Sequence, residues 1–334
     1  MVVLNFYGKI PHTCISEKLG LYLSNLPDTE DNNWRQDLAE EIELAVKADG
    51  IYQDKLGTSY PCGISTLFSN VFPERTVPDS FEKEHYYDLA GQMICLNFEY
   101  NYDDMPLGGW DTNCFDGRFC EEDCAEKIID LISFLGYDNR FSEPIPQWIY
   151  SSNHDGIDHY RIFWGGESSE AYVESLLEWG KLFDNFLQAK NDYLLFDYIL
   201  NAVHKDNEYN EYHLMKAYSL CQLFLEKEHE SELNHKLVQF IDDGLDEEEK
   251  RLCASYLRKL RNKIAHGDFE AFDKVIEEYA VKFMDGRFNF DYSENSRKNW
   301  VILHVCCLLD DAVRKLIWML LYEKASLEKI KNAK

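Results

Sequence analysis

The sequence lacks any long apolar run. The longest one, at residues 300–309, is interrupted by His304 and falls well short of the roughly 20 residues that a membrane-spanning helix needs. The first residues also lack the basic segment and the apolar stretch that together form a signal peptide. We therefore expect a cytoplasmic protein that neither spans nor binds a membrane.

Motifs for nucleotide or hydrolase chemistry are absent as well. The chain has no P-loop, no glycine-rich dinucleotide-binding pattern and no G-x-S-x-G elbow. It has ten cysteines, but Cys306 and Cys307 lie inside an apolar helical pattern that is typical of buried, reduced thiols rather than disulfides. From these features we expect no cofactor and no disulfide framework.

Two segments carry metal-binding residue types without a convincing metal-binding spacing. The first is a C-x5-C-x3-C cluster, which lacks a C-x2-C pair and needs a fourth zinc ligand from Cys62, Cys95 or His85; its members are Cys114, Cys120 and Cys124. The second is the HDGIDH segment at residues 154–159, where Asp155-Gly156 is typical of a hairpin turn. We expect ordinary thiols and a turn, with metal binding as the alternative in each case.

Basic residues are scarce, and they are unevenly distributed. The whole chain has 34 Lys and Arg against 61 Asp and Glu, a net charge of −27, which would repel nucleic acid if it were spread evenly. Residues 1–250 hold 49 acidic and 18 basic residues, a net charge of −31, whereas residues 251–334 hold 12 and 16, a net charge of +4. Anion binding is therefore expected in the last quarter of the chain.

The hydrophobic periodicity divides the chain into two parts. Hydrophobic residues make up 45% of the sequence and aromatic residues 14%, which is enough for packed cores. The first part mixes predicted strands, at residues 2–7, 93–100, 147–151 and 160–164, with predicted helices at 33–48 and 121–135. From residue 168 onward amphipathic helical patterns follow one another up to residue 322, before a charged tail that we expect to fray. We predict an α+β domain at 1–166 and an all-α domain at 167–326.

The most informative segment, YLRKLRNKIAHG at residues 256–267, closes one of the predicted helices. At 100° per residue, an apolar stripe forms on one side of this helix from Cys253, Leu257, Leu260 and Ile264. Arg261 falls at the edge of the stripe, where a side chain can line a groove. Gly267 suits the left-handed position just after a helix, so His266 is expected at the helix end, where the helix dipole favours a protonated imidazole.

An arginine near a histidine is a suitable pair for phosphodiester chemistry. The guanidinium neutralises developing charge, and the imidazole moves the proton of an attacking or leaving oxygen. Arg261 and His266 are five residues apart, however, which places them about 140° apart around an ideal helix. Either the helix unwinds at its end, or two copies of the segment meet in one cleft, and the second arrangement predicts a homodimer.

The segment from Arg261 to His266 resembles the R-x4–6-H motif of HEPN domains, including the polar residue, here Asn262, that directly follows the arginine. The His266-Gly267 continuation is similar to the Apea-like branch of that superfamily. The resemblance covers about residues 168–322, and it includes the helical patterns around residues 212–221 and 313–316. It implies an all-α HEPN-like bundle for the C-terminal domain.

The resemblance also implies a metal-independent endoribonuclease with a composite site from two protomers. In that family the 2′-hydroxyl attacks the adjacent phosphate and leaves a 2′,3′-cyclic phosphate and a 5′-hydroxyl. Arg261 would stabilise the phosphorane, His266 would act as the acid and base, and Asn262 would orient one of them. By analogy, such a nuclease would serve antiviral defence in bacteria or act as a toxin.

Further cations surround the motif, and we expect Arg258, Lys259 and Lys263 to bind the RNA substrate. The alternative is a solvated helix face paired with the acidic run at 247–249. The function has an alternative too, a non-catalytic HEPN interaction module in which Arg261 pairs with an acid and His266 caps carbonyls. In either case the N-terminal domain is expected to sense a trigger or to hold a partner protein.

Overall fold

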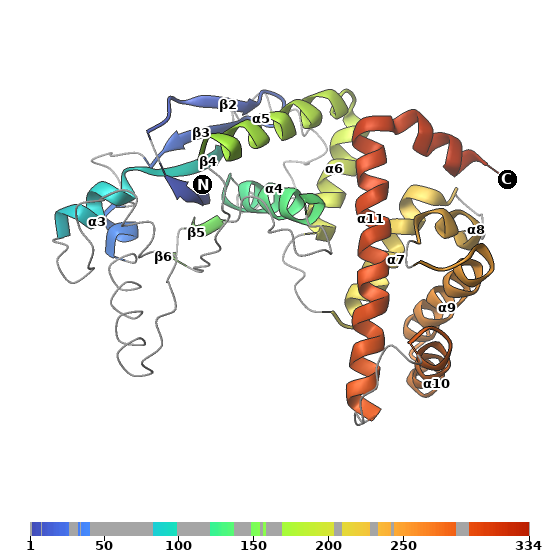
Figure 1. Ribbon diagram of the computed structural model, residues 1–334. Coiled ribbons are helices and arrows are strands. Elements are labelled where there is room, and N and C mark those ends of the chain that lie inside the picture. Colours follow the sequence, from blue (N-terminus) through green and yellow to red (C-terminus); the bar gives the residue numbers. More distant parts are fainter. Residues whose placement is uncertain are drawn as a thin grey trace, which may run out of the picture. The chain divides into compact units, whose positions relative to one another are not determined.

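The computed structural model of the protein describes residues 2–7, 9–26, 33, 35–40, 83–98, 121–136, 148–153, 156–157, 169–203, 209–227, 233–241, 244–284 and 294–333. Contacts within the chain group it into two compact units, residues 1–204 and 205–334. The predicted fold class is confirmed, because an α+β part is followed by a largely helical part (Figure 1).

The first unit contains an antiparallel sheet whose strand order is β2-β3-β4-β1-β5-β6. Its strands are β1 (Val2–Tyr7), β2 (Thr13–Ser16), β3 (Leu21–Asn25), β4 (Met93–Phe98), β5 (Trp148–Asn153) and β6 (Gly156–Ile157). β3 and β4 pair from Leu21↔Phe98 to Asn25↔Ile94 without a register shift. The sequence predicted β1, β4 and β5 but not β2 and β3.

Helices cover this sheet and complete its core. α4 (Glu121–Gly136) packs against β4 and β5 through a buried apolar face formed by Ile128, Ile129, Leu131, Ile132 and Leu135. α3 (Lys83–Ala90) precedes β4, and residues 35–40 are helical, inside the helix predicted at 33–48. The hairpin predicted at Asp155-Gly156 is consistent with the β5–β6 pairing of Asn153 with Gly156, although His154 and Asp155 lie outside the described residues.

Helix α5 (Ser169–Phe186) is bound to the β2–β3 hairpin of the first unit, as Figure 1 shows. The Asp184 carboxylate accepts a hydrogen bond from the Ser16 hydroxyl at 2.5 Å and from the backbone N–H of Lys18 at 3.2 Å. At Gly180 the helix approaches β2 so closely that an added Cβ would collide with the carbonyl oxygen of Ile15. Glycine is therefore required at this position.

The first compact unit ends at residue 204, whereas the sequence predicted a domain boundary at residue 166. α5 contacts β2, and α6 (Lys190–Val203) packs against α4. Both helices are amphipathic, as predicted, but their apolar faces complete the core of the first unit. Helical periodicity identifies a buried face without identifying the element that covers it.

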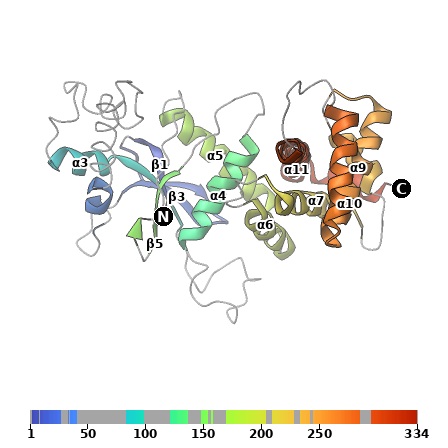
Figure 2. The same ribbon diagram turned by 90° about the horizontal axis from the view of Figure 1, so that it is seen from below.

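Helices are the regular elements of the second unit in its described part. Its elements are α7 (Glu211–Leu225), α8 (Leu233–Leu237) with a 3-10 turn at Val238–Phe240, α9 (Glu247–Ala265), α10 (Phe269–Tyr279) with a π-helical turn at Ala280–Met284, and α11 (Glu294–Asn332). α7 packs along α11, and α9 packs against α7, α8 and α10 (Figure 2). A buried hydrogen bond joins α7 to α11, since His213 Nε2 lies 2.8 Å from Asp310 Oδ1.

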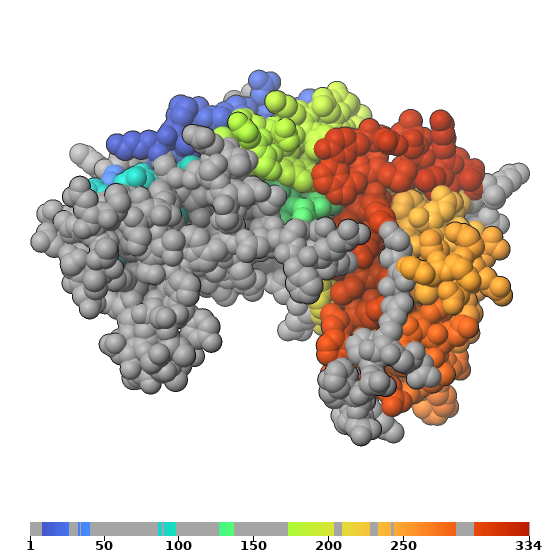
Figure 3. Space-filling model, viewed as in Figure 1, coloured from blue at the N-terminus to red at the C-terminus, as the bar shows by residue number. Residues whose placement is uncertain are grey.

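Helix α11 does not end where the sequence predicted. A break at Glu323, with φ −136° and ψ 45°, marks the predicted end near residue 322, but helix resumes and runs to Asn332. This final segment lies against the α8–α9 region in the space-filling view (Figure 3). The expectation of a fraying tail was therefore wrong, because Lys227 and Lys236 donate hydrogen bonds to its last carbonyls.

Lysine side chains connect the C-terminal ends of α7 and α11. The buried Lys236 donates through Nζ to the carbonyl of Leu225 at 3.1 Å and to that of Lys331 at 2.7 Å. Lys331 in turn donates to the carbonyl of Leu223 at 2.9 Å. These bonds satisfy terminal carbonyls that have no partner within their own helices.

No helix in the described part of the chain is long and apolar enough to cross a membrane.

Candidate active site

Helix α9 carries the segment that the sequence identified, and its start is firmly capped. The Asp246 side chain accepts from the backbone N–H of Glu249, and the Glu249 side chain accepts from that of Asp246, which together form a capping box. Three residues of the predicted apolar stripe, Cys253, Leu257 and Leu260, are buried, and Ile264 is half-buried. The helix is therefore anchored on the side that was predicted.

The other end of α9 is closed by Gly267. This residue has φ +67°, in the left-handed region that favours glycine. Its N–H donates to the carbonyl of Ile264 at 3.0 Å, and the N–H of Asp268 donates to the carbonyl of Lys263 at 2.9 Å, the bond pattern of a Schellman motif. His266 is therefore the C-cap residue, as the sequence predicted.

Arg261 lies at the edge of the buried face and reaches helix α7. Its Nη2 donates to Gln222 Oε1 at 3.2 Å, and its Nη1 donates to Asn262 Oδ1 at 3.2 Å. The guanidinium carbon lies 5.9 Å from the ring centroid of Tyr218. Both hydrogen-bond partners are neutral amide oxygens, and no ion pair to Arg261 occurs among the described residues. The alternative in which Arg261 pairs with an acid is therefore not observed there.

The Arg261 side chain also keeps an unused donor. Its Nε is buried and has no hydrogen-bond partner in the part of the chain that the structure describes. Buried donors without a partner are uncommon in folded proteins and call for an explanation. Below the guanidinium, burial raises the pKa of Tyr218 well above its usual range, so that this ring remains neutral beside the arginine.

His266 is exposed, and its imidazole makes no hydrogen bond or ring contact within the described residues. Only its backbone N–H is engaged, with the carbonyl of Asn262 at 3.1 Å. The alternative role in which this side chain caps carbonyls thus has no contact to support it. The helix keeps its regular winding up to Ala265, so Arg261 and His266 are not brought together within this chain.

The three cations expected to bind substrate surround the motif in different ways. Arg258 is exposed, Lys259 Nζ lies 4.6 Å above the ring of Tyr256, and Lys263 forms a 2.9 Å ion pair with Asp268. None of them pairs with the acidic run at 247–249 within the described residues. The alternative of a helix face neutralised by that run is not observed there.

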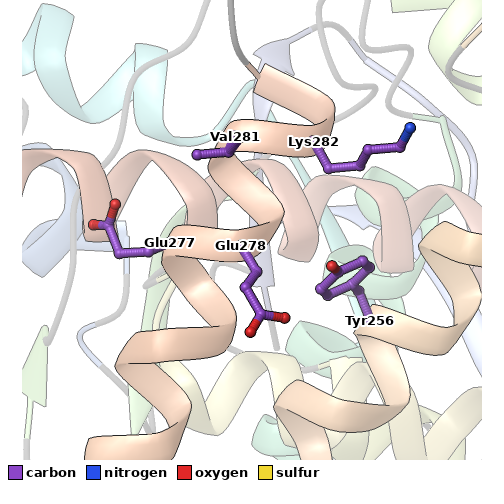
Figure 4. A pocket seen from close by; sticks show the side chains of 5 residues that line it. All are labelled: Tyr256, Glu277, Glu278, Val281 and Lys282. Carbon is purple, nitrogen blue, oxygen red and sulfur yellow. The ribbon is translucent and has the colours of Figure 1, made fainter.

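A shallow pocket of about 520 Å³ lies beside α9 and was not foreseen from the sequence. It is lined by Tyr256, Glu277, Glu278, Val281 and Lys282, and Figure 4 shows Glu278 and Tyr256 facing each other from neighbouring helices. Burial and the charge of Glu278 raise the pKa of the Tyr256 hydroxyl. Two carboxylates at its rim make this pocket a poor site for a phosphate.

The described residues contain no cluster of three or more His, Cys, Asp or Glu that could hold a metal ion. Cys62, Cys114 and Cys120 lie outside these residues, as do the side chains of Cys124 and His85. Cys95 is buried in β4, where burial raises the pKa of its thiol to about 12.

Comparisons with protein-family models, with curated proteins and with solved structures find no match for this sequence. The candidate site is therefore defined by the residues and contacts of this chain.

Proposed function

We propose that the protein is a metal-independent endoribonuclease of HEPN type, acting as a homodimer through a composite site. The observation that carries this proposal is the environment of Arg261. Its charge is held in place by two neutral amide oxygens rather than neutralised by a carboxylate. An arginine held in this way keeps its charge available to a phosphate, and its Nε–H is a donor left without a partner in the described part of the chain.

The proposed reaction is a transesterification within the RNA. The 2′-oxygen attacks the adjacent phosphorus while an imidazole of His266 accepts its proton, and the bond from phosphorus to the 5′-oxygen breaks as a protonated imidazole donates to that oxygen. The products are a 2′,3′-cyclic phosphate and a 5′-hydroxyl. Arg261 stabilises the charge on the phosphorane oxygens, and Asn262 orients Arg261 through their hydrogen bond.

Dimerisation follows from the separation of the two side chains. Arg261 faces α7 and His266 faces solvent, and no contact joins them within the described residues of one chain. A second copy would bring its own histidine to the arginine of the first. The exposed Arg258 and Lys259, together with Lys263 once it leaves Asp268, would then hold the RNA backbone beside the cleft.

The wider role is proposed by analogy. The acidic N-terminal domain would sense a trigger or hold a partner protein, and the nuclease would serve in antiviral defence or as a toxin. We place the protein in the cytoplasm, where buried thiols such as Cys221, Cys253 and Cys306 stay reduced.

The decisive experiment is incubation of the purified protein with total RNA in EDTA, followed by mapping of the cut ends. We expect cleavage that leaves 2′,3′-cyclic phosphates, and a loss of roughly 100-fold or more in both Arg261→Ala and His266→Ala. The matched controls are Arg251→Ala, which removes an exposed arginine of the same helix, and His235→Ala, which removes an exposed histidine of α8. Both should cleave like the unmodified protein.

A second candidate function, the non-catalytic interaction module, is favoured by one observation. Tyr212 on α7 is 84% exposed, and tyrosine is a residue type enriched in protein–protein interfaces. This function predicts no cleavage of any RNA and a stable hetero-complex that Tyr212→Ala weakens. Undiminished cleavage by the Arg261→Ala, His266→Ala double variant would contradict the assigned nuclease site.

A further inference from the structure

Helix α7 contributes a residue to the candidate site that the motif on α9 does not contain. Gln222 accepts a hydrogen bond from Arg261 Nη2 at 3.2 Å and donates one from Nε2 to Glu226 Oε2 at 2.9 Å. The other carboxylate oxygen of Glu226 accepts from the backbone N–H of Leu233 at 3.2 Å. A chain of hydrogen bonds therefore runs from Arg261 through Gln222 and Glu226 to the start of α8.

The chemistry of these groups allows only one orientation of the Gln222 amide. Arginine has donors and no acceptor, and a carboxylate has acceptors and no donor. The amide must therefore present its oxygen to Arg261 and its nitrogen to Glu226. Because Glu226 is itself held by the backbone of Leu233, the amide oxygen facing the guanidinium is fixed in position.

The same arrangement places the Gln222 amide between the Glu226 carboxylate and Arg261. A glutamate in direct contact would neutralise the guanidinium, whereas the amide passes on only a hydrogen bond. Asn262 provides a second amide oxygen on the other terminal nitrogen. Two neutral acceptors thus fix the plane of the guanidinium while its charge stays available for a phosphate.

We propose that Gln222, oriented by Glu226, is a positioning residue that holds Arg261 in the geometry needed for cleavage. This inference rests on the proposed ribonuclease function and adds to it a residue from a different helix. Gln222 acts through Arg261 and does not touch the RNA. Loss of Gln222 should therefore lower kcat and leave KM nearly unchanged, since the exposed cations that bind the backbone are unaffected.

The test compares Gln222→Met, which keeps the side-chain volume and removes the amide, with Gln222→Ala. We expect kcat to fall roughly 10- to 100-fold in both, the range for losing one hydrogen bond to a charged group in the transition state. Gln36→Ala is the matched control, because Gln36 donates to Glu40 at 2.7 Å in the same i, i+4 arrangement without any arginine. It should leave kcat unchanged, and thermal melting should show that all three variants are folded.

A rescue experiment separates positioning from a general loss of stability. Guanidinium ions at millimolar concentration should restore part of the cleavage to Arg261→Ala. In this variant the amide oxygens of Gln222 and Asn262 remain, and they can accept hydrogen bonds from the added ion. Guanidinium ions should restore much less to the Arg261→Ala, Gln222→Met double variant. Equal rescue of both would overturn the proposal.

The outcomes also distinguish this inference from the function on which it rests. If Arg261→Ala abolishes cleavage and Gln222→Met cleaves at the normal rate, the nuclease assignment stands and the positioning role is wrong. If the unmodified protein does not cleave RNA, or if Arg261→Ala cleaves normally, the proposed function fails and this inference fails with it.

Discussion

Single residues decide where the candidate histidine sits. Gly267 ends α9 in a left-handed conformation, with open space where a Cβ would stand, so the requirement for glycine is conformational rather than steric. Because the Schellman bonds of Gly267 and Asp268 fix the turn, they also fix the backbone of His266. The backbone at His266 is therefore held by the turn, and its imidazole projects from the end of α9.

We expect Gly267→Ala to lower the free energy of unfolding by about 1 kcal/mol, the usual cost of a left-handed conformation in a residue other than glycine. Gly244→Ala is a matched control, since Gly244 also has φ +67° and open space at its Cβ position. Denaturant unfolding should show similar losses in both variants. RNA cleavage should fall only in Gly267→Ala, and equal activity in the two variants would contradict the link to His266.

At the scale of elements, the attachment of α5 to the first unit depends on close packing. The helix is held by the bonds that Asp184 accepts and by the absence of a side chain at Gly180, which lets the helix approach the carbonyl of Ile15. A helix predicted to begin the C-terminal domain thereby completes the N-terminal one.

Gly180→Ala should destabilise the protein by about 1–3 kcal/mol, because backbone atoms cannot move aside as a flexible side chain can. Gly136→Ala is the matched control, since Gly136 ends α4 with nothing near its Cβ position, and it should be neutral or slightly stabilising. Urea unfolding followed by circular dichroism measures both changes. A neutral Gly180→Ala would show that α5 does not need its close approach to β2.

The sequence predicted the end of α9 better than the helices that α9 contacts. The apolar stripe of α9 and the glycine that ends it are local features, and both are confirmed. The contact of Arg261 with Gln222 joins residues 39 positions apart, and it depends on the register between α7 and α9. Periodicity in one helix cannot fix that register, so this part of the site could not be predicted from the sequence.

At the scale of the whole molecule, the proposed site is complete only in a dimer. A mixture of the Arg261→Ala and His266→Ala proteins contains mixed dimers that keep one arginine and one histidine. We expect the mixture, after subunit exchange, to regain part of the cleavage that each variant alone has lost. RNA cleavage and sizing by light scattering measure the result, and a mixture as inactive as its components would contradict a composite cleft.

The junction closed by Lys236 has an electrostatic consequence. The C-terminal end of a helix carries about half a negative charge, so the ends of α7 and α11 together carry about one. Three lysine ammonium groups face this combined charge. Lys236 is bonded to a carbonyl at each end, Lys227 to the carbonyl of Asn332, and Lys331 to that of Leu223. Together they offset the repulsion between the two helix ends. Unwinding the last turn of α11 would remove the negative end of that helix and with it one of the two carbonyls that Lys236 binds. Lys236 would then be held less firmly against the end of α7, the helix that carries Gln222.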